Sequence, residues 1–419
     1  MEKIIINGGK KLYGNVTIPV AKNSVLPILA ASVLCDGIVT VRSVPTLSDT
    51  NAAVDILKSL GLHVRYVKNE ISVCCGDMVK SKIPYELMQT MRSSIFFAAP
   101  ILARVGQVEI SNPGGCRLGE RPIDIHLAGL CAMGAYVQEM PQGKVVITAP
   151  QGLMGTNFTL RLPSVGATET LIMAAVTARG KTILQNTAKE PEIADLADFL
   201  NACGGKIRGA GSKTIQIIGV PKLEGCSYTP IPDRITAATV MCGVAAVGGC
   251  VTLASSRPFH IASLGEALTA AGSHIEYRQN SLTITSNGTA SGIGEIKTGT
   301  FPTLATDCAP LLAAALLKGN GITEIEDTIF QNRFACADGF LKMGAKVEVV
   351  NNKLRINGVN ALYGDSLQAT DLRGGAALVI AALAGKGTSV VTGCEYINRG
   401  YEDIAQLFSS LGADIEKKL

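Results

Sequence analysis

Residues 309–317 read Ala309-Pro310-Leu311-Leu312-Ala313-Ala314-Ala315-Leu316-Leu317, an apolar run that begins just after Thr306-Asp307. A second run of this kind, residues 25–31, follows Lys22-Asn23. A helix that is apolar on all its sides has to be buried on all its sides. These runs therefore predict fully buried core helices, with the strands of the fold packed outside them.

Glycines divide the chain into repeats. One series ends helix-like segments every 68 to 73 residues, at positions 61, 134, 204, 272, 344 and 412. A second series precedes β-branched strands, and its members are Gly37, Gly106, Gly180, Gly248, Gly321 and Gly387. Glycine accepts the positive φ with which a chain leaves a helix, so both series predict helix exits. The chain should thus contain six α/β units of about 70 residues.

The length of 419 residues exceeds what a single core usually serves. Six units in a chain of this length predict two domains of three units each. Each unit supplies two helices and two or three strands, enough for a small mixed sheet outside a buried helix. The fold class expected is therefore α/β.

Composition excludes several classes of protein. Hydrophobic residues make up 47% of the chain and charged residues 17%, which indicates a folded globular protein. The net charge is only +4 and no run of Lys and Arg exceeds two, so we expect no nucleic-acid partner. No apolar stretch reaches 18 unbroken residues, so we expect no membrane partner either.

Cysteine and histidine usage indicates a reduced cytoplasmic protein without a metal site. The 12 cysteines include no CxxC pair, and the four histidines are isolated. Most of these cysteines stand among Ala, Leu and Gly and are predicted to be inert core residues: Cys35, Cys131, Cys203, Cys242, Cys250 and Cys308.

Cys116 differs from these because it lies in a polar loop. Pro113-Gly114-Gly115 predicts an exposed turn in front of it, and Arg117 and Arg121 follow. Positive surroundings lower the pKa of a thiol and raise its reactivity. We therefore predict that Cys116 is a reactive residue.

Lys22, Arg92 and Arg373 are cations at or beside the starts of predicted core helices. The start of a helix is the positive end of its dipole and favours anions, so a cation there is locally unfavourable. Either a bound anionic ligand compensates these side chains, or they are solvated helix caps. The sequence leaves both interpretations open.

Nine motifs, in order along essentially the whole chain, resemble those of the UDP-N-acetylglucosamine 1-carboxyvinyltransferase family of enolpyruvyl transferases. They are Ala21-Lys22-Asn23, Met91-Arg92-Ser93-Ser94, Pro113-Gly114-Gly115-Cys116 running to Arg121-Pro122, Pro163-Ser164-Val165-Gly166-Ala167-Thr168, Pro232-Asp233-Arg234, Thr306-Asp307, Asn332-Arg333-Phe334, Thr370-Asp371-Leu372-Arg373 and Asn398-Arg399-Gly400-Tyr401-Glu402.

The resemblance implies two similar domains, each an inside-out α/β barrel of three units with buried helices and outer sheets. Residues 22–230 would form the first domain, which carries the Cys116 loop. Residues 231–419 would form the second, completed by the N-terminal strand in residues 1–21. The substrate site would lie in the cleft between the domains.

The implied reaction moves the enolpyruvyl group of phosphoenolpyruvate to the 3′-hydroxyl of UDP-N-acetylglucosamine and releases phosphate. It begins peptidoglycan precursor synthesis and proceeds through a tetrahedral intermediate, with no cofactor and no metal. The resemblance implies that Cys116 is the acid and Asp307 the base. It also implies that Lys22, Arg121 and Arg399 hold phosphoenolpyruvate. The catalytic residues would be Cys116, Asp307, Lys22 and Arg399.

Further residues match substrate-binding positions of the family. Those for the nucleotide sugar are Asn23, Arg92, Arg121, Pro122, Ile123, Asp124, Ile125, Leu162, Pro163, Ser164, Val165, Gly166, Asp307 and Ile329, and charged residues of the cleft are Glu190, Arg333, Asp371 and Arg373. Some family members have Lys where this chain has Leu162, so only backbone contacts to the uracil are expected from that position.

Two other functions compete with this prediction. One is the sister transferase that acts on shikimate 3-phosphate, which lacks the Pro-Gly-Gly-Cys loop. The other is a non-catalytic paralogue that senses the nucleotide sugar, although all the matching catalytic residues are present. We expect a monomer whose partners are small-molecule substrates.

Overall fold

The structure is a computed structural model that describes residues 2–76, 79–114 and 122–418. These residues form two compact units. The first unit comprises residues 20–76, 79–114 and 122–231, and the second unit comprises residues 2–19 and 232–418. The chain thus passes between the units after Pro19 and after Ile231.

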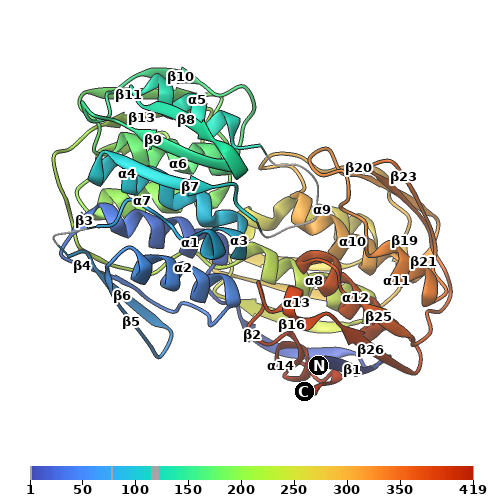
Figure 1. Cartoon of the computed structure of the whole chain (residues 1–419). Coiled ribbons are helices and arrows are strands. Elements are labelled where there is room, and N and C mark those ends of the chain that lie inside the picture. Colours follow the sequence, from blue (N-terminus) through green and yellow to red (C-terminus); the bar gives the residue numbers. More distant parts are fainter. Residues whose placement is uncertain (1, 77–78, 115–121, 419) are drawn as a thin grey trace. The chain divides into compact units, whose positions relative to one another are not determined.

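Each unit has three buried helices at its centre, as the apolar runs predict. In α10 every residue is buried, and in α12 only the first residue is not. Figure 1 shows α8, α10 and α12 of the second unit inside its strands, and these three helices contact one another. The central helices are α1 (Lys22–Ala31), α4 (Ala98–Val105) and α6 (Val165–Ala175) in the first unit, and α8 (Arg234–Val247), α10 (Ala309–Leu316) and α12 (Leu372–Ala384) in the second.

Three sheets of three or four strands surround the core of the first unit. Strands alternate buried and exposed side chains, so one face of each sheet packs on the helices. Their orders are β15-β4-β6-β5, β7-β9-β8 and β10-β11-β13-β12. The strands are β4 (Ile38–Val41), β5 (His63–Val67), β6 (Glu70–Cys74), β7 (Gln107–Ser111), β8 (Tyr136–Met140), β9 (Lys144–Thr148), β10 (Asn157–Thr159), β11 (Lys181–Gln185), β12 (Ile207–Arg208), β13 (Thr214–Ile218) and β15 (Ser227–Tyr228).

The second unit repeats this arrangement with the orders β17-β18-β16-β2, β20-β22-β24-β23 and β25-β26-β1-β27. Its strands are β1 (Lys3–Asn7), β2 (Leu12–Thr17), β16 (Gly249–Ala254), β17 (His274–Arg278), β18 (Ser281–Ser286), β20 (Gly294–Lys297), β22 (Ile322–Glu326), β23 (Lys346–Val350), β24 (Lys353–Asn357), β25 (Ser366–Gln368), β26 (Thr388–Thr392) and β27 (Asp414–Lys418). The α/β prediction of repeated units with buried helices and outer sheets is confirmed.

Strands from opposite ends of the chain complete these sheets. β1 lies between β26 and β27 and is antiparallel to both. β2 is parallel to β16, whereas β15 is parallel to β4. The second unit therefore takes β1 and β2 from before the crossing at Pro19, whereas β4 and β15 lie near the two ends of the first unit's own continuous segment.

A second helix follows in each repeat, and the predicted glycines mark the turns. All twelve have φ between 79° and 104°. The glycines at 61, 134, 204, 272, 344 and 412 follow the C-caps of these helices by one or two residues. The helices are α2 (Ser48–Ser59), α5 (Asp124–Ala132), α7 (Pro191–Ala202), α9 (Ala262–Ala270), α11 (Ala337–Lys342) and α14 (Ile404–Ser409).

The second glycine series needs a correction. Only Gly106 and Gly248 cap core helices. The other four lie in turns just before strands, because the core helices end several residues earlier and a short segment such as β3 (Cys35–Asp36) or β21 (Gly319–Asn320) intervenes. They are Gly37, Gly180, Gly321 and Gly387.

The prediction of a buried core position is also wrong for two cysteines. Cys131 and Cys250 are exposed, since Cys131 lies on the outward side of α5 and Cys250 at an outward position of β16. Among the described residues, no helix is both long and apolar enough to cross a membrane.

Candidate active site

Three charged side chains predicted from separate motifs meet at the starts of the second unit's core helices. Asp307 lies in the 3-10 turn η5 (Thr306–Cys308) ahead of α10, and Arg373 lies in the first turn of α12. Arg333 Nη2 donates to Asp307 Oδ1 at 2.6 Å, and Arg373 Nε donates to Asp307 Oδ2 at 3.0 Å. Each carboxylate oxygen therefore has its own arginine.

The exposure of this cluster is uneven. The Arg333 side chain is 1% exposed and that of Arg373 is 5%, whereas Asp307 keeps 28%. Burial by itself would raise the pKa of Asp307, but Arg373 and Arg333 outweigh it and hold the pKa far below its usual value. Burial would lower the pKa of Arg373, and Asp307 reverses this effect. Asp307 is thus a carboxylate whose open side can meet a ligand.

Each arginine is held on its buried side by hydrogen bonds that the sequence motifs did not indicate. Arg333 Nε donates to Thr306 Oγ1 at 2.9 Å, and Thr306 Oγ1 in turn donates to Asp327 Oδ2. Arg373 Nη1 donates to the Tyr401 hydroxyl at 3.2 Å. Tyr401 stands in the quoted Asn398–Glu402 motif, but nothing in that motif indicates that it contacts residue 373.

Lys22 forms a buried ion pair with a carboxylate of the protein itself. Its Nζ lies 2.9 Å from Asp49 Oδ2. The exposed fractions of the two side chains are 10% and 5%. Asp49 belongs to the first turn of α2, 27 residues away, and no sequence motif indicated this contact. Neither a solvated cap nor a ligand is therefore required to explain a cation at the start of α1.

The starts of α5 and α6 form a second cluster of predicted residues. Gly166 approaches His126 so closely that a Cβ there would lie 3.1 Å from His126 Nε2. Burial, and after it the charge of Arg92, lower the pKa of His126 to about 4, although Asp124 opposes them. Arg92 also donates from Nη1 to the carbonyl of Pro113 at 3.5 Å. His126, interpreted from sequence as isolated, thus lies among three predicted site residues.

Helix caps account for three more predicted residues. Ser164 caps α6 by accepting from the amide of Ala167 at 3.3 Å. Asp371 caps α12 with Oδ1, while its Oδ2 is buried without a hydrogen-bond partner among the described residues. Glu190 is the N-cap residue of α7. The pKa of fully buried Glu169 is raised, first by burial and then by Glu192 and Glu190.

The remaining predicted residues lie as follows. Cys116 and Arg121 fall outside the described residues. Leu162 and Ile329 are exposed, at 58% and 45%, and Arg399 and Asn23 are half-buried. Asp124 accepts from Arg161 Nη2 at 2.6 Å. The others are the exposed Pro122, the buried Ile123 before α5, the half-buried Ile125 in α5, and the half-buried Pro163 and Val165 at the start of α6.

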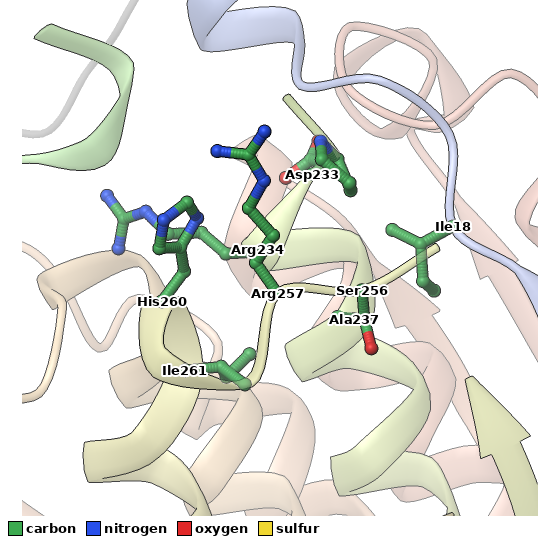
Figure 2. A pocket seen from close by; sticks show the side chains of 9 residues that line it. Ile18, Asp233, Arg234, Ala237, Ser256, Arg257, His260 and Ile261 are labelled. Carbon is green, nitrogen blue, oxygen red and sulfur yellow. The ribbon is translucent and has the colours of Figure 1, made fainter. Parts of the chain in front are cut away.

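Two pockets open in the second unit. Figure 2 shows one at the start of α8, where Arg234, Arg257 and His260 are among the lining residues. The Asp233 carboxylate already accepts from the first amides of α8 there, so we assign no ligand to it. The other has a volume of about 480 Å³ and is lined by Asn332, Asp338, Asn351 and Asp371 among others. Within the described part of the chain, no His, Cys, Asp and Glu side chains are grouped to hold a metal.

Comparisons with known proteins agree with one another. Residues 6–408 match the family described as EPSP synthase (3-phosphoshikimate 1-carboxyvinyltransferase). The chain is 43% identical, over its full length and 99% of the relative, to UDP-N-acetylglucosamine 1-carboxyvinyltransferase 2 of Carboxydothermus hydrogenoformans. It is 41% identical, with the same coverage, to UDP-N-acetylglucosamine 1-carboxyvinyltransferase of Finegoldia magna.

Solved structures share the fold. The enolpyruvyl transferase NikO from Streptomyces tendae matches all of this chain and 99% of its own, with a TM-score of 0.88 and 23% identity. EPSP synthase from Acinetobacter baumannii matches over the full length of both chains, with a TM-score of 0.76 and 20% identity.

Proposed function

We propose a function from the premise that this chain belongs to the UDP-N-acetylglucosamine 1-carboxyvinyltransferase family of enolpyruvyl transferases, within the wider EPSP synthase family. It transfers the enolpyruvyl group of phosphoenolpyruvate to the 3′-hydroxyl of UDP-N-acetylglucosamine and releases phosphate. This reaction starts peptidoglycan precursor synthesis, and we place it in the cytoplasm. The observation that carries the proposal is 43% identity over the whole chain.

The reaction is an addition followed by an elimination. The 3′-hydroxyl oxygen bonds to the central carbon of phosphoenolpyruvate, while the methylene carbon gains a proton and becomes a methyl group. The tetrahedral intermediate then loses a methyl proton, and its carbon–oxygen bond to phosphate breaks. Both steps need a proton donor on one side and a proton acceptor on the other.

Two residues of this chain suit those proton transfers. Cys116, in its polar loop, is the proposed acid toward the methylene carbon. Asp307 is the proposed base toward the sugar hydroxyl, because its carboxylate is ionised and keeps an exposed side. A carboxylate held by two arginines is a weak base, however, so the arginine contacts must change before it takes a proton.

Cations of the site bind the anionic groups of the substrates. The phosphate and carboxylate of phosphoenolpyruvate are proposed to bind Lys22, Arg121 and Arg399. The nucleotide sugar is proposed to bind Arg92 and the starts of α5 and α6. Lys22 has to exchange Asp49 for this ligand, since the two are 2.9 Å apart in the structure. Charge-assisted hydrogen bonds of this kind are strong in a site closed to water. The location of this site between the domains and the monomeric state stay predictions.

A phosphate-release assay separates the candidate functions. Phosphoenolpyruvate with UDP-N-acetylglucosamine should release phosphate, whereas phosphoenolpyruvate with shikimate 3-phosphate, or alone, should not. Release only with shikimate 3-phosphate would favour the sister transferase. Binding of the nucleotide sugar without any release would favour a sensor.

Alkylation by the epoxide fosfomycin tests the role of Cys116. One adduct should appear in the intact mass, and the variant Cys116→Asp should form none. Cys131 is exposed and provides the control, because Cys131→Ser should still form the adduct. An adduct that persists in Cys116→Asp contradicts the assignment.

A further inference from the structure

The hydrogen bonds behind Arg373 have one consistent direction. Thr239 Oγ1 donates to the carbonyl of Ile235 at 2.8 Å, which uses its single proton. The Tyr401 hydroxyl, 2.6 Å from Thr239 Oγ1, must therefore donate to it and accept from Arg373 Nη1. This relay joins α12 to α8 and ends on a neutral helix carbonyl.

The relay behind Arg333 ends on a charge instead. Thr306 Oγ1 accepts from Arg333 Nε and donates to Asp327 Oδ2. Asp327 is 1% exposed, and its other oxygen accepts from the amides of Ile329 and Phe330 at 2.9 and 2.7 Å. A buried carboxylate so anchored cannot follow Arg333 outward, and Arg333 Nε lies 3.8 Å from it.

The two arginines of Asp307 are therefore held unequally. Arg333 has a second carboxylate behind it and stacks on Phe330, with its guanidinium carbon 4.8 Å from the ring centre. Arg373 has the phenol of Tyr401 behind it, with its guanidinium carbon 5.7 Å from the ring centre, and a larger exposed fraction. Asp233 favours the cation through its charge, but within the described residues Arg373 forms its ion pair with Asp307 alone.

Both arginines donate to a hydroxyl, but Thr306 donates onward to a carboxylate and Tyr401 onward to a neutral hydroxyl. A hydrogen bond to an ionised group is about twice as strong as a neutral one, so Arg333 is held more firmly and Arg373 leaves Asp307 more easily.

We propose that Arg333 is the permanent partner of Asp307 and Arg373 the exchangeable one, so that an anionic substrate draws Arg373 away and frees Oδ2 of Asp307. Thr306–Asp327 and Tyr401–Thr239 are then positioning residues that decide which arginine moves. The inference deepens the proposed function and rests on it.

Freed Oδ2 is the atom that takes the proton. When Arg373 turns to the anion, Asp307 loses one of the two cations that hold its pKa down, and its proton affinity rises. Asp233 also favours the cation Arg373 through its charge, and it stays bound to the first amides of α8. Oδ2 then accepts the proton of the 3′-hydroxyl as that oxygen bonds to the enolpyruvyl carbon. Binding of the anion thus switches on the base.

Nitrogen-15 spectra of the arginine Nε–H groups test this directly on the full chain. The substitution Arg373→Lys removes and so assigns one resonance, and Phe330→Leu shifts the other by removing the ring under Arg333. Addition of UDP-N-acetylglucosamine with inorganic phosphate should shift the Arg373 resonance. It should also speed the exchange of that proton with water about tenfold, the effect of one lost hydrogen bond. The Arg333 resonance should change little.

Calorimetry on the same samples separates this inference from the proposed function. Measured binding with an unmoved Arg373 resonance, or with Arg333 moving instead, overturns the inference alone. Absence of binding overturns the proposed function and the inference with it.

A crossed pair of variants tests the relays without substrate. Tyr401→Phe should speed exchange at Arg373 Nε and leave Arg333 unchanged, whereas Thr306→Val should do the reverse. In turnover, Tyr401→Phe should alter kcat more than KM for UDP-N-acetylglucosamine. Equal effects of both variants on both arginines would mean that the relays only stabilise the fold, and would contradict the proposal.

Discussion

The Lys22–Asp49 pair predicts a large loss of stability from a single substitution. In Asp49→Asn the ammonium group of Lys22 stays buried beside a neutral amide. Removal of one partner from a buried ion pair costs about 3–5 kcal/mol. Because the Lys22 side chain is still 10% exposed, we expect Asp49→Asn to lower the free energy of unfolding by about 3 kcal/mol, at the lower end of this range. For a compact unit of this size that lowers Tm by roughly 6–12 °C.

A matched control lies in the same unit. Lys82 Nζ is also 2.9 Å from a carboxylate, Oε1 of Glu109, but these side chains are 61% and 30% exposed. Glu109→Gln should cost at most about 1 kcal/mol, because exposed pairs are screened by water. Urea unfolding and differential scanning calorimetry of the full chain measure both variants.

The double variant Lys22→Met/Asp49→Leu completes the test. Since it leaves no buried charge, it should regain most of the stability that Asp49→Asn loses. If Asp49→Asn costs no more than Glu109→Gln, burial does not set the strength of this pair, and the reasoning is refuted.

Three further predictions concern pH and backbone conformation. Burial, with Arg92, lowers the pKa of His126 to about 4, so between pH ~6.5 and ~4 the unfolded chain binds a proton that the folded chain does not. The free energy of unfolding should therefore fall by about 3 kcal/mol over this pH range. Urea titrations at several pH values should show a smaller fall for His126→Gln. Because the pKa of Asp307 is held far below its usual value, its ion pairs stabilise the fold above pH ~4 and weaken as the pH falls further. The difference in free energy of unfolding between wild type and Asp307→Asn should therefore become smaller in acid. A difference that stays constant with pH would contradict these ion pairs. Gly134 has φ of 92° with nothing near its would-be Cβ, so Gly134→Ala should cost only about 1 kcal/mol, whereas Gly219→Ala, whose Cβ would lie 1.6 Å from the carbonyl oxygen of Ala178, should cost clearly more.

Much of the fold could be predicted from local patterns. An apolar run such as residues 309–317 reports its own burial, because the periodicity of a helix lies within one or two turns. A glycine such as Gly134 reports a positive φ for the same local reason. Local signals also mislead, as at Gly37, where a helix end and a strand start lie only a few residues apart.

The candidate site was predictable residue by residue but not as contacts. Asp307, Arg333 and Arg373 each stood in a quoted motif, yet Asp307 and Arg373 are 66 residues apart. Asp49 and Asp327 stood in no quoted motif. Nothing in a local pattern indicates which carboxylate a buried cation will meet, because that depends on how helices from different repeats pack.

The sequence by itself determined that this chain contains six repeated α/β units with buried helices. Helix burial and glycine turns are properties of short segments, so they can be inferred without the rest of the chain. Only the tertiary structure decided that β2 pairs with β16 and β15 with β4, and that two arginines share Asp307. The edge of a strand can pair with any other strand of suitable geometry, and a charged side chain can pair with any opposite charge. The packing of distant segments decides which of these partners lies within reach.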